Sequence, residues 1–365
     1  MDFDFSTEQD QLREAVSNWV RRSYSFERRR QIESSSGFSK EVYDELAALG
    51  LPALLFGEDD GGLGLGPIEM MVVMEELGRG IVLEPLIHAF LCSSILAKST
   101  AKEASAWREA IASGSSLVVL AYQEPGARYE LSACTTTATP VDAKKHWTLL
   151  GQKSLVAAGD EVDAFIVPAS TAQGMGLFWV DRNDPGVDLR SYRTLDGARV
   201  AHLSLNGARA HLITPDGSPA LQEAVDLGIA CICAEGIGVM EAMLAQVLEY
   251  LNVRKQFGVS LASFQALRHR VADMKTQLEL ARSMSYLATL KLNASSEERH
   301  LAVSRAKYQL GNAMRFIGQQ GVQLHGGIGM TDECVVSHYF KRLTQLEMTF
   351  GDTTHHLGQM SAACL

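Results

Sequence analysis

The segment Arg254-Lys-Gln-Phe-Gly258 combines residue types that could hold a phosphorylated ligand. Arg254 carries a planar, permanently charged guanidinium that suits a pair of anionic oxygens such as those of a pyrophosphate. Phe257 offers a flat apolar face, and Gly258 allows the chain to turn sharply. The same residue types are also common at a plain helix C-terminus, where basic side chains precede a glycine. On this segment alone, both interpretations stay open.

Glu235 is a single carboxylate within Cys-Ile-Cys-Ala-Glu-Gly-Ile-Gly, a run of small and apolar residues. A carboxylate buried in such surroundings has a raised pKa, which is typical of residues that exchange protons in catalysis. Such an acid can equally be structural and paired with an arginine of a neighbouring helix. Both alternatives are kept for Glu235.

Several segments resemble the acyl-CoA dehydrogenase family, flavoenzymes that oxidise acyl thioesters. In the family's order they are Glu124-Pro-Gly126, Gly151-Gln-Lys-Ser154, the stretch from Met240 to Gly258 with Phe264-Gln265, and Gln323–Met330. The resemblance covers essentially the whole chain. It implies an α+β fold with an N-terminal α-helical domain, a middle β-barrel domain and a C-terminal four-helix bundle.

The helical and β-rich residue patterns along the chain agree with that order of domains. Residues 1–115 show helical spacing, for example Leu12, Val16 and Trp19 after the capping pattern that begins at Ser6. Residues 116–217 contain short β-rich runs at 117–122, 133–138, 146–150, 164–168, 176–180 and 201–205, separated by Gly, Pro and Asp. Residues 218–365 return to long helical patterns, with candidates at 221–254, 264–293, 297–324 and 331–344 followed by a tail. We take these three stretches as the domains.

Composition excludes several classes of protein. The chain has 365 residues and a net charge of −10, which argues against a nucleic-acid surface, so anionic ligands would need local patches such as Arg268-His269-Arg270 or Lys341-Arg342. The six cysteines lack metal-ligand spacing, and His355-His356 are adjacent, so we expect no metal site. Neither a secretory signal nor an uninterrupted membrane-spanning run is visible, and we expect a cytoplasmic protein.

The resemblance implies FAD as the cofactor. Arg254 and Phe257 match the Arg-x-x-Phe-Gly motif, which in the family reaches the FAD of a neighbouring subunit. The remaining positions that the resemblance assigns to the cofactor are Gln256, Gln265, Gln323, Gly326, Gly327, Thr353 and His355.

The resemblance also exposes gaps. The family carries its catalytic Glu in Tyr-Glu-Gly-Thr, where this chain has Gly351, or on the long bundle helix, where it has Gly228. The candidate bases that remain are Asp352, one residue from Gly351, and Glu235, which lies seven residues beyond Gly228 and two turns along the same helical face. In the middle domain, Leu155 and Ala157 replace the Trp and the hydroxyl residue of the family's Gly-x-Lys-x-Trp-Ile-Thr segment.

Two hypotheses follow. The chain could be a working acyl-CoA dehydrogenase with an unusual base, using electron-transferring flavoprotein as the acceptor. Alternatively, it could be a largely non-catalytic subunit of a heterotetramer with a catalytic paralogue, to whose FAD site it contributes Arg254 and Phe257. Its two ends look most like the small subunits of two-subunit members of the family, such as pimeloyl-CoA dehydrogenase. The segments concerned are Met1–Phe5, His338–Thr344 and Phe350–Leu357.

Overall fold

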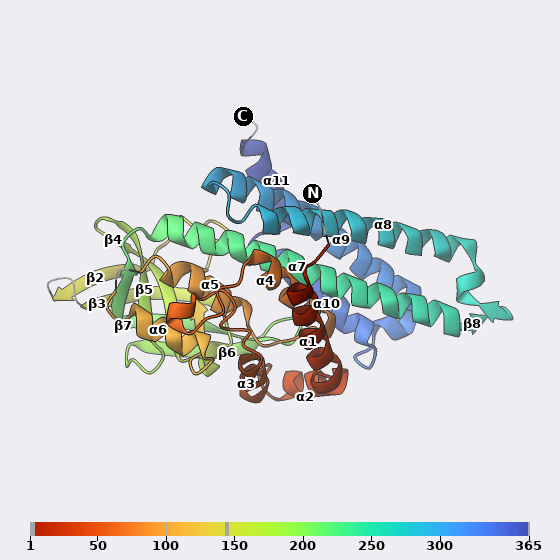
Figure 1. The fold of residues 1–365 in the computed structure, drawn as a ribbon, viewed down its shortest axis with the longest axis horizontal. Helices are drawn as coiled ribbons and strands as arrows, with labels where there is room; N and C mark the ends of the chain where they lie inside the picture. Colours follow the sequence, from red (N-terminus) through yellow and green to blue (C-terminus); the bar gives the residue numbers. More distant parts are fainter. Residues whose placement is uncertain (1–3, 100, 143–145, 364–365) are drawn as a thin grey trace. The chain divides into compact units, whose positions relative to one another are not determined.

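The computed structural model describes residues 4–99, 101–142 and 146–363, and it divides into two compact units (Figure 1). The bundle unit comprises residues up to 29, residues 67–82 and residues from 229 onward. The sheet unit comprises residues 30–66 and 83–228. Each unit is described separately below. These units are defined by contacts and combine segments that are distant in the sequence, so they differ from the three predicted domains. The predicted domain boundaries after residues 115 and 217 stay predictions.

The bundle unit is built from helices that begin at identifiable caps. The Ser6 side chain accepts a hydrogen bond from the backbone of Gln9, whose own side chain returns one to Ser6, so the expected capping pattern is present. Ser295 caps the long helix α9 in a similar way through Glu298 N–H. The helices that lie wholly in this unit are α1 (Thr7–Ser23), α4 (Pro67–Gly80), α8 (Gln265–Leu290), α9 (Ser296–His325), α10 (Val335–Met348) and α11 (Thr353–Ala362). The helix α9 packs against α8, α10 and α11, and α1 packs against α4.

Helix α7 (Gly217–Val253) supplies the centre of the bundle unit through its residues from 229 onward. Its small residues allow α4 to approach closely, because a Cβ added at Gly238 would collide with the backbone of Glu75. Likewise, a Cβ added at Gly78 on α4 would collide with the backbone of Glu235 on α7. These two glycines therefore allow the backbones of α7 and α4 to lie close together. Among the described helices, α7 alone is long and apolar enough to cross a membrane by composition, but 83% of its apolar window is buried in the protein.

The sheet unit contains a β sheet that closes on itself. Its strands are β1 (Val118–Leu120), β2 (Thr137–Asp142), β3 (His146–Ala157), β4 (Ala164–Thr171), β5 (Gly174–Asp181), β6 (Val187–Arg193) and β7 (Arg199–Thr214). The order is β1-β4-β2-β3-β7-β5, β5 also pairs with β4, and β6 pairs with β7. The longest ladder joins β3 and β7 in antiparallel register, from Trp147↔Ala210 to Ala157↔Val200.

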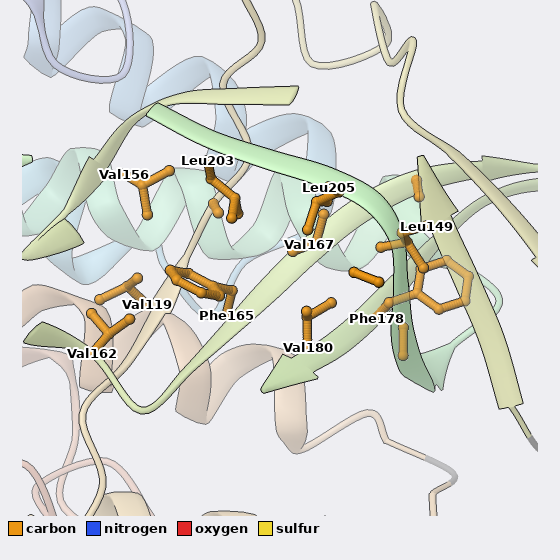
Figure 2. Close-up of a cluster of buried hydrophobic side chains, with 14 of the residues drawn as sticks. Val119, Leu149, Val156, Val162, Phe165, Val167, Phe178, Val180, Leu203 and Leu205 are labelled. Atoms are coloured by element: carbon orange, nitrogen blue, oxygen red, sulfur yellow. The ribbon is translucent and has the colours of Figure 1, made fainter. Parts of the chain in front are cut away.

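Side chains from facing strands fill the interior of this sheet (Figure 2). Phe165 from β4 and Phe178 from β5 are fully buried, and they lie among Leu203, Leu205 and Val180. Burial of these apolar surfaces is the main stabilising contribution to the sheet unit. Helices α3 (Lys40–Ala48), α5 (Ile87–Leu96) and α6 (Ala104–Ala112) complete the unit, and α2 (Phe26–Ser35) lies where the chain passes between the two units.

The fold class is as predicted, with helices, then a β domain, then helices. Several local predictions were wrong. The strand expected at 133–138 begins only at Thr137, strand β6 was not expected, and helix α11 stands where a tail was expected. The helix expected at 331–344 begins at Val335 and ends at Met348.

Candidate cofactor cleft and the family's base positions

Helix α7 is followed directly by a tight hairpin that presents Phe257. The helix ends at Val253, and Arg254 N–H still donates to the Tyr250 carbonyl at 2.8 Å. Strands β8 (Lys255–Gln256) and β9 (Val259–Ser260) then pair across Phe257 and Gly258, which both have positive φ angles of 54° and 81°. Two such residues form the turn that suits a two-residue hairpin, although a phenylalanine rarely adopts this conformation. The Phe257 ring is 90% exposed.

An open cleft of about 640 Å³ lies beside this hairpin in the bundle unit. It is lined by Tyr250, Arg254, Gln256, Leu261, Ala266, Leu267, Arg270, Gln323, Leu324, His325, Gly326, Gly327 and Ile328. The structure thus brings together Arg254 and Gln256 with the segment from Gln323 to Gly327, as the motif matches implied. Gln265 does not line the cleft, although its neighbour Ala266 does.

The charge of the cleft is positive. None of its lining residues is an aspartate or glutamate, in a chain whose net charge is −10. Arg254 makes no side-chain hydrogen bond or ion pair with the described part of the chain, and Arg270 Nη1 donates to the neutral amide of Gln320 at 3.1 Å. His325 Nδ1 donates to the Gly321 carbonyl at 2.9 Å, and burial lowers the pKa of this histidine. Two arginines without carboxylate partners make the cleft suitable for an anion.

The shape of the cleft also fits a ligand. A Cβ added at Gly326 or Gly327 would meet nothing within 4 Å, so the backbone is open to an incoming group at both positions. Tyr250 and His325 stack with ring centroids 4.4 Å apart, which adds an aromatic element to the lining. A volume of this order is typical of small-molecule sites. The residues present therefore fit the phosphate-bearing part of a nucleotide cofactor.

Glu235 is committed to an ion pair. It is 4% exposed, and its Oε1 accepts from Arg342 Nε at 2.6 Å and lies 2.5 Å from Arg342 Nη2. Two guanidinium nitrogens therefore contact one carboxylate oxygen in a charge-assisted interaction. It corresponds to the structural alternative, a buried acid paired with an arginine of the bundle.

Asp352 is committed to a helix cap. Its Oδ1 accepts from the backbone N–H of His355 at 2.8 Å, and Asp352 is the N-cap of α11. The neighbouring position, Gly351, has a φ of 112°, and a Cβ there would lie 2.6 Å from His356 Nε2 and 2.7 Å from His355 Cδ2. Imidazole rings therefore fill the space into which a glutamate at position 351 would extend.

Thr353 and His355 lie at the start of α11 and do not line the cleft. The Thr353 backbone and hydroxyl both donate to Glu347 Oε1, at 3.0 and 2.7 Å, and Arg315 donates to the same oxygen at 3.0 Å. The fully buried Lys307 donates to the carbonyls of Glu347 and Gly351 at 2.7 and 2.8 Å. Glu347 and Lys307 thus hold the loop that in the family carries the base. Sequence reasoning missed both roles, because their partners are backbone groups, a threonine and an arginine 32 residues away.

In the sheet unit, the motifs at 124–126 and 151–154 meet through a buried ion pair. Lys153 Nζ donates to Glu124 Oε1 at 2.6 Å, and both side chains are almost fully buried. Thr135 and Thr136 donate to the same carboxylate through their backbone and hydroxyl groups. Burial alone would raise the pKa of Glu124, but the hydrogen bonds from Lys153 and the threonines outweigh it and hold the pKa well below its ordinary value. These two motifs therefore have a structural role.

Three models of one protein family match the chain in succession: the N-terminal domain of acyl-CoA dehydrogenase at residues 6–115, the middle domain at 119–208 and the C-terminal domain at 216–365. The chain belongs to the acyl-CoA dehydrogenase family. The chemistry of the cleft agrees with that membership, because family members are FAD flavoproteins and oxidoreductases of fatty acid metabolism. A bound flavin supplies the hydride acceptor that no side chain can provide.

Similar proteins match most of the chain. Caffeyl-CoA reductase-Etf complex subunit CarC of Acetobacterium woodii is 26% identical over 92% of this chain and 93% of that protein. Human mitochondrial short-chain specific acyl-CoA dehydrogenase is 26% identical over 87% of this chain and 81% of its own length.

Two similar solved structures are each named for two proteins. The ChsE4-ChsE5 complex from Mycobacterium tuberculosis matches with a TM-score of 0.91 at 25% identity, covering 100% of this chain and 99% of that chain. The Tcur3481-Tcur3483 steroid ACAD G363A variant matches with a TM-score of 0.90 at 26% identity, covering 98% and 97%.

Proposed function

We propose that this chain is a subunit of a heterotetrameric acyl-CoA dehydrogenase, and that it lends Arg254 and Phe257 to an FAD held mainly by a catalytic paralogue. The reaction is α,β-dehydrogenation of an acyl-CoA thioester. The observation that carries the proposal is the hairpin at 255–260, which presents Phe257 with 90% of its surface exposed beside the unpaired guanidinium of Arg254. A large apolar ring held outward in a rare backbone conformation suits a contact with another subunit.

The state of the family's base positions supports the same proposal. Glu235 is bound by Arg342, Asp352 caps α11, and position 351 is filled by the rings of His355 and His356. A proton acceptor must be within reach of the substrate carbon and must not be committed elsewhere. The chain therefore retains the residues that it would offer to a neighbour and lacks a free carboxylate at its own base positions.

The comparisons add support for a two-gene complex. Two of the similar structures are named for two proteins each, and one similar protein is a caffeyl-CoA reductase-Etf complex subunit. On this basis we extend the proposal to electron-transferring flavoprotein as the acceptor. The resemblance of the chain ends to the small subunit of pimeloyl-CoA dehydrogenase makes dicarboxylic or steroid side-chain acyl-CoAs the first substrates to test.

A second candidate function is a self-sufficient homo-oligomeric dehydrogenase that uses Glu235 as its base. The observation in its favour is the burial of this carboxylate on the long helix of the bundle unit. The ion pair with Arg342 stands against it, because catalysis would have to break a buried ion pair.

The deciding experiment compares the chain alone with the chain co-expressed with a candidate catalytic paralogue of similar length. Each sample is saturated with FAD, passed over a gel-filtration column, and assayed with several acyl-CoA classes and an artificial electron acceptor. We expect retained flavin absorbance and turnover only in the co-expressed sample. Turnover by the chain alone at about 1 s⁻¹ or faster, the lower end of ordinary enzyme rates, would reject the partner role.

A further inference from the structure

We propose that Glu75 and Glu241 compete for the guanidinium of Arg282, and that this competition makes the contact among helices α4, α7 and α8 respond to pH. When Glu75 is protonated, Arg282 stays bound to Glu241. When Glu75 is ionised, it attracts Arg282 away from Glu241. All three residues belong to the bundle unit and none of them lines the cleft, so the inference does not depend on the proposed function.

Glu75 is a buried carboxyl group with very few polar contacts. It lies on α4, and only 1% of its side chain is exposed. Its Oε1 is buried and has no hydrogen-bond partner among the described residues. Its Oε2 lies 3.7 Å from Arg282 Nη1, which is beyond hydrogen-bond distance. Such a group is unfavourable when ionised, and binding a proton removes its charge.

The charged and titratable groups around Glu75 come from four helices. They are Arg13 on α1, Glu76 and Arg79 on α4, Glu241 on α7, and Glu279, Arg282 and Tyr286 on α8. Three of these groups are arginines, and each of them could balance the charge of Glu75. The state of Glu75 therefore depends on which carboxylates the three arginines bind.

Glu241 binds the guanidinium that Glu75 lacks. Arg282 Nη2 contacts Glu241 Oε1, and Arg79 Nη1 contacts Glu241 Oε2, so one carboxylate holds two arginines. Arg282 therefore contacts Glu241 closely and Glu75 only at a distance. The two carboxylates lie on different helices, α7 and α4, while Arg282 lies on α8. One guanidinium shared in this way has the two alternative arrangements that a switch requires.

The other two arginines contact Glu76, the neighbour of Glu75 on α4. Arg79 Nε lies 3.2 Å from Glu76 Oε2, and Arg13 Nε lies 3.8 Å from Glu76 Oε1. The guanidinium carbon of Arg13 also lies 4.2 Å from the centre of the Phe5 ring. Glu75 and Glu76 are both buried, with 1% and 3% exposure, but only Glu76 is close to two guanidinium groups. Burial is therefore the same for the two residues, and their pairing differs.

The sign of the pH effect follows from this geometry. Burial raises the pKa of Glu75 to about 7, against the lowering effect of Arg282 and Arg13. The ordinary value for a glutamate is 4.5, so between these two values the folded chain keeps a proton that the unfolded chain releases. The contribution of Glu75 to stability is therefore complete below about pH 4.5, falls as the pH rises to about 7, and is constant above that.

Urea unfolding of the full-length chain at a series of pH values, followed by circular dichroism, tests this sign. Glu75→Gln keeps the shape of the protonated residue and has no charge. We expect its urea midpoint to exceed that of the wild type at about pH 8, because the wild type then buries a poorly paired carboxylate. We also expect the variant to lack the fall in stability between about pH 4.5 and pH 7.

Glu76→Gln is the matched control, because Glu76 is equally buried beside Glu75 but lies close to two guanidinium groups. Its urea midpoint should lie below that of the wild type at about pH 8, since the substitution leaves arginines without their carboxylate. It should keep the wild-type fall in stability between about pH 4.5 and pH 7, because Glu75 is still present.

Infrared difference spectroscopy measures the protonation of Glu75 directly. The wild type at about pH 6 should show the C=O band of a protonated carboxylic acid that Glu75→Gln lacks, and this band should disappear as the pH rises above about 7. Glu241→Gln frees Arg282 for Glu75 and should shift this loss to lower pH. Arg282→Gln removes the shared cation and should shift it to higher pH. A purely structural role of these side chains would not move the band.

Several results would overturn the inference. A Glu75→Gln variant that is less stable than the wild type at about pH 8 would show that the ionised carboxylate is stabilising there. The absence of the infrared band at about pH 6 would show that Glu75 is already ionised. A zero or opposite shift of the band in Glu241→Gln or in Arg282→Gln would exclude the competition. The two variants act in opposite directions, so either one tests the competition if the other fails to fold.

Discussion

The buried pair of Glu124 and Lys153 provides a direct test of what holds together the segments at 124–126 and 151–154 of the sheet unit. The perturbation is Lys153→Met, which keeps most of the side-chain volume and removes the ammonium group. In the wild type, Lys153 Nζ lies 2.6 Å from Glu124 Oε1, with side-chain exposures of 0% and 2%. After the substitution, Glu124 remains buried as a carboxylate without its cation.

The expected cost follows from that burial. Breaking a buried ion pair by removing one partner typically costs about 3–5 kcal/mol, because an uncompensated charge stays inside the protein. Here Thr135 and Thr136 still donate to the carboxylate, so we expect the lower end, about 3 kcal/mol. The double variant Glu124→Gln/Lys153→Met removes both charges. Its destabilisation should be about 2 kcal/mol smaller than the sum of the destabilisations of the two single variants.

The pH dependence has a definite sign. The pKa of Glu124 lies well below its ordinary value of 4.5 in the folded protein, because its hydrogen bonds outweigh the effect of burial. Its stabilising contribution is therefore complete above about pH 4.5 and is lost as the pH falls further. In Glu124→Gln, the loss of stability on acidification below that pH should be smaller than in the wild type.

The assay is urea unfolding followed by tryptophan fluorescence, since Trp147 and Trp179 are both buried in the sheet unit. Calorimetric scans between pH 7 and pH 3 give the acid dependence. A cost below about 1 kcal/mol for Lys153→Met, typical of an exposed ion pair, would refute the reasoning. Additive costs in the double variant would show that the two side chains do not act as a pair.

Three further predictions concern the bundle unit. Glu235→Gln should lower the melting temperature by several degrees and leave the turnover of the complex with the paralogue nearly unchanged. Arg342→Met should lower the melting temperature by a similar amount. Loss of turnover in Glu235→Gln at unchanged stability would instead make Glu235 the base. Gly351→Glu should create no activity in the chain alone, and it should destabilise the chain by about 2 kcal/mol or more. The reason is that a Cβ at position 351 would collide with His356 and that the φ angle of this position is positive. A stable and active variant would contradict this prediction. Burial lowers the pKa of Lys307 to about 8 in the folded protein. The wild type should therefore gain stability relative to Lys307→Met as the pH rises from about 8 toward 10.5, which thermal unfolding measures. An equal change of stability with pH in the two proteins would contradict this assignment.

The parts of the fold that the sequence predicts are those where burial imposes a period. Helix α1 begins at the predicted cap, and the strong β-formers of β4 and β5 fall in buried strands. Strand β6 (Val187–Arg193) escaped notice because its residues alternate only between exposed and half-buried positions. Its position depends on backbone pairing with β7, which leaves no hydrophobic pattern to read. Helix α11 escaped for a related reason, since only Thr353 and His356 are buried in it.

Only some features of the candidate site could be predicted from the sequence. Motif spacing identified Arg254 and Gln323, because a cofactor demands particular residue types near glycines, and the structure places both in one cleft. The status of Glu235 could not be predicted, since its partner Arg342 lies 107 residues away and any of several arginines had the right charge. Arg270 shows the converse limit: its chemistry was visible in the sequence, but its lack of a carboxylate partner was not. The functional meaning of a charged residue therefore rests on which charges the fold leaves without a partner, and the cleft contains two arginines, Arg254 and Arg270, that bind no carboxylate in the described part of the chain.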